Sequence, residues 1–366
     1  MIQTLYWGTL LFSGLTAFSR KIQNTKVLKW LCVAVTLCGI VLVISANREG
    51  NDIINYVNNY NATKTFDREP LYTLLTIMGD AMGMNFYQFH AFIAALGYLL
   101  IVLTLKKYTG NIQFILFFYC WHLLLMDSMQ VRNFLAVCIL IYSVQFLQDI
   151  RQKKNLICYC VGIFLAANIH TAFVIYYILM LLLIKGRKTF IRALFAVGVI
   201  LTVMTGLNGN KIPFIEQLVS LLMSDVSRAE SYFSLRTNLG FLPPMILYVV
   251  ALVGIWLVKE QEDTALANNN EIRFVNIVWG INLCFVVVVP MMMMSLTFYR
   301  LIRNLLYLNF AVYSIGWFRQ RKVKKRLLLL LLVCGLCSGW AIFDFAIYAD
   351  YEAILEPVFS GKWFWE

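Results

Sequence analysis

A few arginines, acids and one histidine lie at the ends of apolar segments, where they can act on a ligand. Arg132 opens one apolar run, His170 closes the next, and the basic turn 151–154 joins the two runs. If both runs are membrane helices, Arg132 and His170 lie at the same membrane face. Ionisable side chains at membrane depth are costly and mark functional sites. We therefore expect a site at this face.

Arginine together with histidine suits a phosphate-bearing lipid substrate. The planar guanidinium binds phosphate oxygens through paired hydrogen bonds and stays charged. Imidazole exchanges a proton near neutral pH. Arg132 lies near a helix start, where the helix dipole disfavours a cation, which favours an anionic ligand there. Arg300, Arg303 and Tyr307 are three and four residues apart, so one helix face presents them together, and the two arginines repel each other unless an anion lies between them.

A long segment between apolar runs brings further polar residues to the same face. These residues are Arg48, Asp52, Glu69 and Tyr72. Some have a purely structural alternative, which stays open. Arg48 can extend to lipid phosphates, and Glu69 can favour a helix start through the dipole. His170 can be an interfacial histidine, His122 reads as a core residue, and Asp344 is a polar group without explanation in an apolar run.

Composition predicts an all-α polytopic integral membrane protein. The 366 residues are 61% hydrophobic and 14% charged, with mean hydropathy +0.73. Apolar runs recur from end to end without strand-like alternation, and only helices then satisfy the backbone in lipid. We expect one domain over 1–366 with about twelve spans. These are 2–19, 27–46, 86–105, 111–127, 130–149, 155–170, 171–184, 190–207, 241–258, 274–294, 296–317 and 327–347.

The distribution of positive charge predicts the orientation. Short loops that alternate between spans hold 21 of the 31 lysines and arginines, so these loops face the cytoplasm and both termini face out. The net charge of +12 is explained in this way, and nucleic-acid binding is not expected.

Two outer segments, 47–85 and 208–240, are too long for simple turns. Pro70 at a first helical position predicts a short helix over 71–82 that cannot span. We expect both segments to be partly helical and to wall a cavity, with Glu69 and Tyr72 facing in.

Several classes of chemistry find no support in the sequence. There is no phosphate-binding glycine loop and no inner loop long enough for a nucleotide-binding domain. No metal-binding motif or histidine cluster is present, so we expect neither a metal nor another cofactor. Cys334 and Cys337 lie inside a predicted span and are read as packing residues.

The chain resembles the EpsG/Wzy-like bacterial polysaccharide polymerases. The resemblance rests on ordered motifs at one membrane face, most clearly between residues 45 and 175. The motifs are Arg48…Asp52…Tyr56, Glu69-Pro70-Leu71-Tyr72, Gln130-Val131-Arg132-Asn133-Phe134-Leu135-Ala136, His170-Thr171-Ala172 and a late arginine, Arg300 or Arg303. One departure is Asn133, where the family pattern has glutamine.

The resemblance implies a metal-independent glycosyltransferase of the bacterial cytoplasmic membrane with an outward-facing active site. A growing glycan on undecaprenyl pyrophosphate would be transferred to a lipid-linked repeat unit. The expected partners of the enzyme are membrane lipid, a chain-length regulator and other polysaccharide-assembly proteins. Capsule, exopolysaccharide and O-antigen are all products of such enzymes.

The expected roles divide between catalysis and binding. Arg132 would stabilise the leaving phosphate, and His170 would be the general base, with Asp52 and Glu69 as the next choices. The residues expected to bind substrate are Arg48, Arg300, Arg303, Gln130, Tyr72 and Tyr307.

Two other functions remain open. A flippase or transporter of lipid-linked oligosaccharide would place polar groups along the membrane depth rather than at one face. A glycan ligase or membrane acyltransferase would be another outer-face enzyme.

Overall fold

The computed structural model describes residues 1–62, 66, 69–148, 152–213, 237–260, 269–348, 351–363 and 365. Every regular element within these ranges is a helix. In this part of the chain, seven helices are long and apolar enough to cross a membrane, or up to eight if one bent pair counts as a span. The all-α polytopic fold is thus confirmed, whereas the number twelve stays a prediction.

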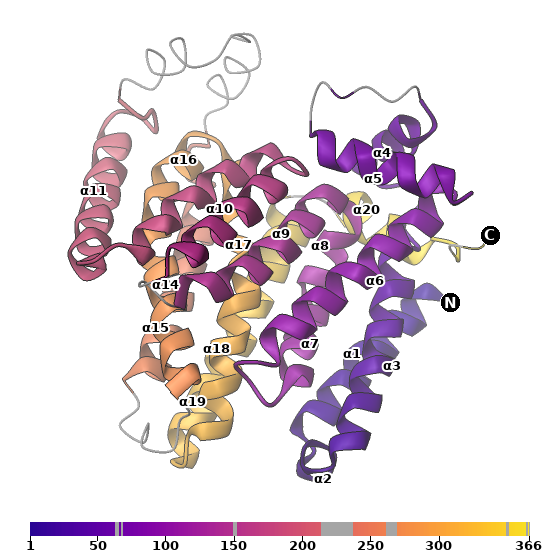
Figure 1. The fold of residues 1–366 in the computed structure, drawn as a ribbon, viewed down its shortest axis with the longest axis horizontal. Helices are drawn as coiled ribbons and strands as arrows, with labels where there is room; N and C mark the ends of the chain where they lie inside the picture. The colour runs from indigo at the N-terminus through magenta and orange to yellow at the C-terminus, as the bar shows by residue number, and fades with distance from the viewer. Residues whose placement is uncertain are drawn as a thin grey trace.

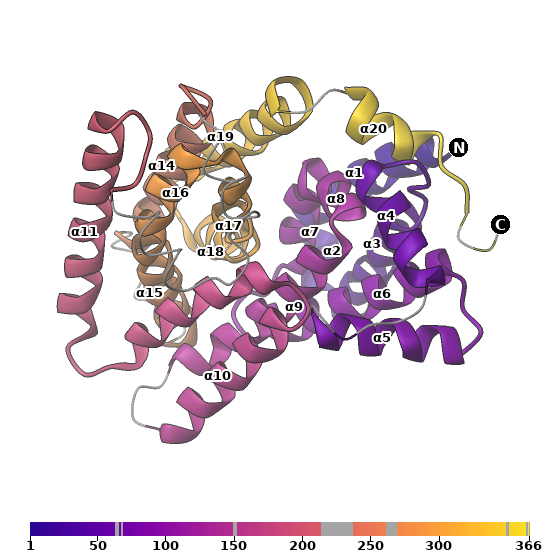
Figure 2. The ribbon, with the colours of Figure 1, turned by 90° about the horizontal axis from the view of Figure 1, so that it is seen from above.

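The helices form two groups, with α9 and α10 between them (Figures 1 and 2). The N-terminal group contains α1 (Ile2–Phe18), α2 (Arg20–Asn24), α3 (Lys26–Ile44), α4 (Asn51–Asn61), α5 (Pro70–Ala81), α6 (Phe86–Leu105), α7 (Ile112–Trp121) and α8 (Leu123–Met129). The connecting part contains α9 (Val131–Val144), η1 (Gln145–Gln148), α10 (Lys153–Ala167) and η2 (Thr171–Leu183).

The second group is formed by the C-terminal half of the chain. It contains α11 (Arg187–Leu207), α14 (Leu242–Lys259), α15 (Asn269–Cys284), η4 (Phe285–Val288), α16 (Val289–Met294), η5 (Leu296–Phe298), α17 (Tyr299–Arg303), α18 (Leu306–Arg319), α19 (Val323–Ile342) and η6 (Phe343–Tyr348). The last helix, α20 (Tyr351–Phe359), returns to the first group, where the rings of Tyr6 and Phe359 lie 5.6 Å apart.

The two ends of the bundle differ in character. Figure 1 shows α2 and the turn between α18 and α19, both rich in basic residues, at one end. At the opposite end α4 and α5 lie across the ends of the longer helices. The predicted short helix is α5, with Pro70 in its first turn. Helix α4 was not expected, although Ile53, Tyr56 and Tyr60, which are buried, have helical spacing.

The predicted boundary at His170 coincides with the break between α10 and η2, whereas the assignment of both segments as spans stays a prediction. Helices α10 and η2 form a hairpin, in which the Tyr159 hydroxyl donates to the Tyr176 carbonyl at 2.8 Å. The second arm is a 3₁₀ helix of 13 residues. Since a 3₁₀ helix rises about 2 Å per residue, this short segment extends roughly 26 Å, close to the thickness of the hydrocarbon core.

Two predicted spans are broken. The predicted span 111–127 is bent by 67° between α7 and α8, at His122. The predicted span 296–317 is divided, because α17 ends at Arg303 and α18 begins at Leu306. The expectation of one continuous helix face through Arg300, Arg303 and Tyr307 is therefore wrong. The second long segment, 208–240, which is also expected to wall the cavity, lies largely outside the described residues.

The charge distribution and the two unlike ends of the bundle predict the result of cysteine labelling. A membrane-impermeant maleimide should label Ile212→Cys in intact cells, and Val323→Cys only after permeabilisation. The unmodified protein is the control, because it reports the background labelling of the native cysteines. Labelling of Val323→Cys in intact cells would reverse the orientation.

Candidate active site

The site is built around Glu69, which precedes α5. Glu69 has a left-handed backbone conformation, with φ 50°, which is uncommon for a residue other than glycine and often marks a functional position. The amide groups of Leu71 and Tyr72 donate to the Asn168 carbonyl at 3.1 and 3.4 Å. The start of α5 is thereby fixed against the end of α10, beside His170.

The Glu69 carboxylate joins three segments of the chain. It accepts hydrogen bonds from an Arg132 Nη1 atom, from His170 Nδ1 at 3.1 Å and from the Thr171 amide at 3.1 Å and hydroxyl at 3.2 Å. The Glu69 side chain is 7% exposed, whereas those of Arg132 and His170 are 36% and 30% exposed. A buried carboxylate therefore holds two basic groups that remain open to a ligand.

The electrostatics of the cluster assign its protons. Burial by itself would raise the pKa of Glu69, but the hydrogen bond from His170 and the charge of Arg132 outweigh burial and lower this pKa. The ionised carboxylate can only accept, so Nδ1 of His170 carries a proton. In neutral imidazole, Nε2 is then left as the acceptor.

Two tyrosine rings flank the Arg132 guanidinium. Its central carbon lies 5.0 Å from the Tyr56 ring centroid and 5.9 Å from that of Tyr72, within cation–π range. Arg132 Nε also donates to the Tyr56 hydroxyl at 3.3 Å. The Tyr72 hydroxyl is buried and makes no hydrogen bond with the described residues, although buried polar atoms are nearly always paired. It is a candidate ligand contact.

The structure does not bring Arg48 into this cluster. The Arg48 guanidinium lies over the Tyr87 ring, 3.4 Å from its centroid, and donates to the Trp363 carbonyl. Arg48 therefore holds the C-terminal segment in place. Asp52 lies in the first turn of α4, one turn before Tyr56, whose pKa is raised by burial and, to a smaller extent, by the Asp52 charge. No hydrogen bond joins Asp52 to the cluster within the described residues.

A second, fully buried polar network lies among the membrane helices. Asp344 accepts from His122 Nε2 at 2.5 Å, from the Tyr299 hydroxyl at 2.5 Å and from Arg303 Nη1 at 3.4 Å. Arg303, only 1% exposed, also donates to Gln130 Oε1 at 2.6 Å. The anion beside Arg303 is thus Asp344 itself, and the sequence reading had left Asp344 and His122 without this role.

The network is linked to the open site through the start of α9. Gln130 lies at the break between α8 and α9, two residues before Arg132. Next to it, the side-chain amides of Asn133 and Asn304 exchange hydrogen bonds of 3.0 and 3.1 Å, which fix α9 beside α17. The packing of the buried network therefore sets the position of Arg132.

The remaining predicted binding residues differ in accessibility. Tyr307 is buried and donates to Asp127. Arg300, one turn before Asn304, is half-buried, and its Nε atom makes no hydrogen bond with the described residues. Gln130, Arg303 and Tyr307 thus have protein partners, whereas the buried Nε atom of Arg300 has none among the described residues. Across the described ranges, no group of three His, Cys, Asp or Glu side chains could hold a metal ion.

Sequence reasoning missed the contributions of Tyr56 and Thr171 to the cluster. Both belong to the motifs that carry the resemblance, Arg48…Asp52…Tyr56 and His170-Thr171-Ala172. Their position inside those motifs was the available signal.

The buried network predicts a large loss of stability in Asp344→Asn. The substitution leaves Arg303 without its counter-charge, and breaking a buried ion pair on one side costs about 3–5 kcal/mol. The apparent melting temperature of the purified protein in detergent should fall. The double variant Arg303→Met/Asp344→Leu should recover part of the loss, because it removes both charges. A wild-type melting temperature for Asp344→Asn would contradict this role.

The lowered pKa of Glu69 predicts a pH-dependent contribution to stability. Because this pKa is lower in the folded state, the contribution is present above the ordinary carboxyl range and is lost as pH falls through the folded value. Glu69→Gln should cost roughly 1–3 kcal/mol at neutral pH, the value of hydrogen bonds to a charged group, and progressively less in acid. Melting curves from pH 7 downwards measure this difference. Glu49→Gln, exposed at the same end, is the matched control and should show no such trend.

Comparison with known proteins assigns the chain to a family. Neither the comparison with curated proteins nor that with solved structures gives a match. The comparison with family models matches the EpsG family over residues 29–355. This range contains α4, α5, the cluster around Glu69 and the buried network around Asp344. Because this match covers most of the 366 residues, the chain belongs to the EpsG family.

Proposed function

We propose that this protein is a polysaccharide polymerase of the bacterial cytoplasmic membrane. It transfers a growing glycan from undecaprenyl pyrophosphate to a lipid-linked repeat unit at the outer face. The EpsG family and the apolar helices support a membrane protein of polysaccharide synthesis. The observation that carries the finer assignment is the buried Glu69 carboxylate, which presents Arg132 and His170 to a ligand.

In this proposal His170 is the general base. Its Nε2 atom removes the proton from the attacking hydroxyl of the acceptor sugar, and the oxygen bonds to the anomeric carbon of the donor. Glu69 accepts the hydrogen bond from Nδ1, which holds the ring orientation and stabilises the imidazolium that forms. The lowered pKa of Glu69 favours this positioning role over the role of base that sequence reasoning left open.

Arg132 acts on the leaving group. As the bond from the anomeric carbon to the phosphate oxygen breaks, its electron pair stays on that oxygen. Nη1 of Arg132 bonds to Glu69 and Nε to Tyr56, while Nη2 makes no hydrogen bond with the described residues. This remaining donor suits the developing charge, where fixed donors accelerate the reaction most. Arg300, which is half-buried and whose Nε atom makes no hydrogen bond with the described residues, is proposed to bind the pyrophosphate.

The outward orientation is part of the proposal. Helix α4 precedes Glu69 and carries Tyr56, and α5 follows Glu69 and carries Tyr72. Both helices lie at the end opposite the basic turns (Figure 1). By the positive-inside rule, that end faces away from the cytoplasm. An outer-face site fits a substrate that is supplied in the outer leaflet rather than as a nucleotide sugar.

A transporter of lipid-linked oligosaccharide is the second candidate. One observation favours it, since Arg303, Asp344 and His122 are ionisable groups within the membrane helices. These groups pair with one another and are almost completely buried, which supports a structural role instead. Reconstituted protein distinguishes the two functions, because only a polymerase forms new glycosidic bonds.

The assignment predicts severe loss of polymer in Arg132→Lys and His170→Ala. Losing one fixed donor costs about a hundredfold to a thousandfold in rate, and a lysine does not replace the guanidinium geometry. Polymer ladders from equal amounts of membrane protein, in a strain lacking its own polymerase, measure the effect.

The matched control is Arg321→Lys, which changes an exposed arginine at the opposite end of the bundle and should retain activity. Full-length polymer at the wild-type rate from both Arg132→Ala and His170→Ala would refute the catalytic assignment while leaving the fold intact.

A further inference from the structure

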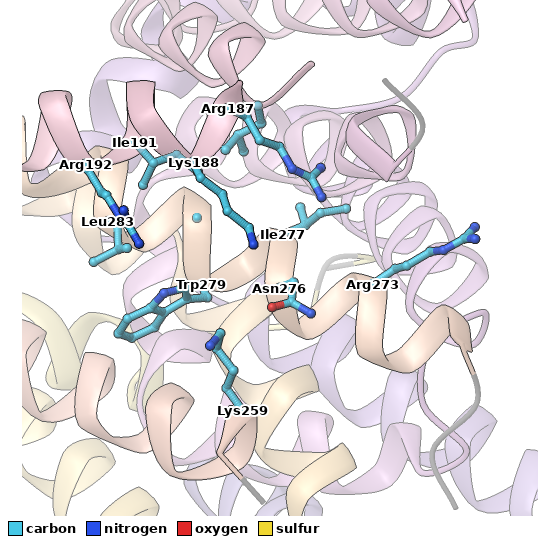
Figure 3. A pocket seen from close by; sticks show the side chains of 12 residues that line it. Arg187, Lys188, Ile191, Arg192, Lys259, Arg273, Asn276, Ile277, Trp279 and Leu283 are labelled. Carbon is cyan, nitrogen blue, oxygen red and sulfur yellow. The ribbon is translucent and has the colours of Figure 1, made fainter. Parts of the chain in front are cut away.

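A second site candidate lies far from Glu69, near the basic end of the second helix group. A cavity of about 510 Å³ opens between α11, α14 and α15. Five basic side chains from these three helices line it: Arg187, Lys188, Arg192, Lys259 and Arg273. Figure 3 shows Lys188 and Lys259 extending into the space from α11 and α14, with Asn276 and Trp279 of α15 beside them.

Among the described residues, most of the positive charge of this cavity is not compensated by acidic side chains. No carboxylate is among its described lining residues. Lys259 has one exposed partner, Glu260, at 3.3 Å. The other four cations make no ion pair within 4.0 Å with any described residue, and Glu271, close by on α15, pairs with Arg319 instead. Like charges collected in one concave site repel each other and attract an anion.

Apart from Asn276, the rest of the described lining is apolar. Leu182, Ile191, Ile277 and Leu283 border the cations, and the Trp279 indole lies among them. Tryptophan is the residue that membrane proteins place at the level of the lipid headgroups. A small soluble anion would use only the charged part of this surface, whereas an amphiphile with an anionic head would use all of it.

Helix α11 explains what such a molecule would add to the fold. In its apolar window only 11% of the residues are buried, the lowest share among the seven helices of the described chain that could cross a membrane. Val197, Ile200 and Val203 are 47%, 57% and 56% exposed on its surface. Acyl chains beside this helix would fill contacts that the protein does not supply.

We propose that the cavity binds the phosphodiester headgroup of an anionic phospholipid, with Lys188 and Lys259 as its main contacts and the acyl chains along α11. Basic pockets between membrane helices on the cytoplasmic side bind such headgroups. The bound lipid joins α11 to α14 and α15. This inference goes beyond the proposed reaction and does not depend on it.

Native mass spectrometry of the purified full-length protein in detergent tests the proposal. The probes are dioleoyl phosphatidylglycerol, dioleoyl phosphatidylcholine and inorganic phosphate as a competitor. Lys188→Gln/Lys259→Gln should weaken binding of phosphatidylglycerol by about thirtyfold, since each basic residue near an anionic headgroup contributes about 1 kcal/mol, a factor of about five. Lys188→Arg/Lys259→Arg, which keeps both charges, should bind almost as well as wild type.

The matched control is Lys324→Gln/Lys325→Gln, which removes two exposed charges at the same end of the bundle. It should leave phosphatidylglycerol binding unchanged, and phosphatidylcholine should bind weakly to every variant. Three results would each overturn the proposal: equal binding of the two lipids, equal loss in the control variant, or displacement of phosphatidylglycerol by millimolar inorganic phosphate, which would indicate a site for a free anion.

Discussion

A carboxylate that is removed from water must be paired, and the pairing of Glu69 organises this protein. Its partners Arg132 and His170 lie 63 and 101 residues further along the chain. An unpaired buried charge would cost several kcal/mol, so the start of α5, the start of α9 and the α10–η2 hairpin are constrained to meet. The same pairing keeps Arg132 at a helix start, where the dipole alone would disfavour a cation. The geometry proposed for catalysis is therefore also a condition of the fold.

The polar clusters around Glu69 and around Asp344 differ in their exposure to solvent. In the cluster around Glu69 the carboxylate is buried and its basic partners are partly open, an arrangement that suits ligand binding. In the buried network Arg303 and Asp344 form an ion pair, and both side chains are removed from solvent. Gln130 connects the two, because its side chain accepts from Arg303 while its backbone marks the break before α9. A buried network of paired groups that contacts the elements carrying a site helps to hold that site in a defined geometry.

The sequence predicted three residues of the cluster around Glu69, but not their pairings. Arg132, Glu69 and His170 were recognisable because an ionisable group at the end of an apolar run is costly, and because ordered motifs contain them. That Glu69 orients His170 depends on the left-handed turn before Pro70 and on contacts across more than one hundred residues, which no local pattern records.

The buried network around Asp344 was harder to predict from the sequence for a related reason. His122 and Asp344 are 222 residues apart, and each alone looks like an isolated polar group in an apolar run. The bend at His122 and the break after Arg303 leave hydropathy almost unchanged, so the runs around them read as continuous spans. The length and recurrence of the apolar runs, without strand-like alternation, were in contrast sufficient for the all-α membrane fold.

The central claim is that this site forms glycosidic bonds between lipid-linked repeat units. The most direct measurement uses purified protein in proteoliposomes with one defined undecaprenyl-pyrophosphate-linked repeat unit as the only substrate. Product length and released undecaprenyl pyrophosphate are followed together. The account predicts a glycan ladder, with one undecaprenyl pyrophosphate released for each bond formed. Active, folded protein that moves the lipid-linked unit across the bilayer without lengthening it would contradict the account.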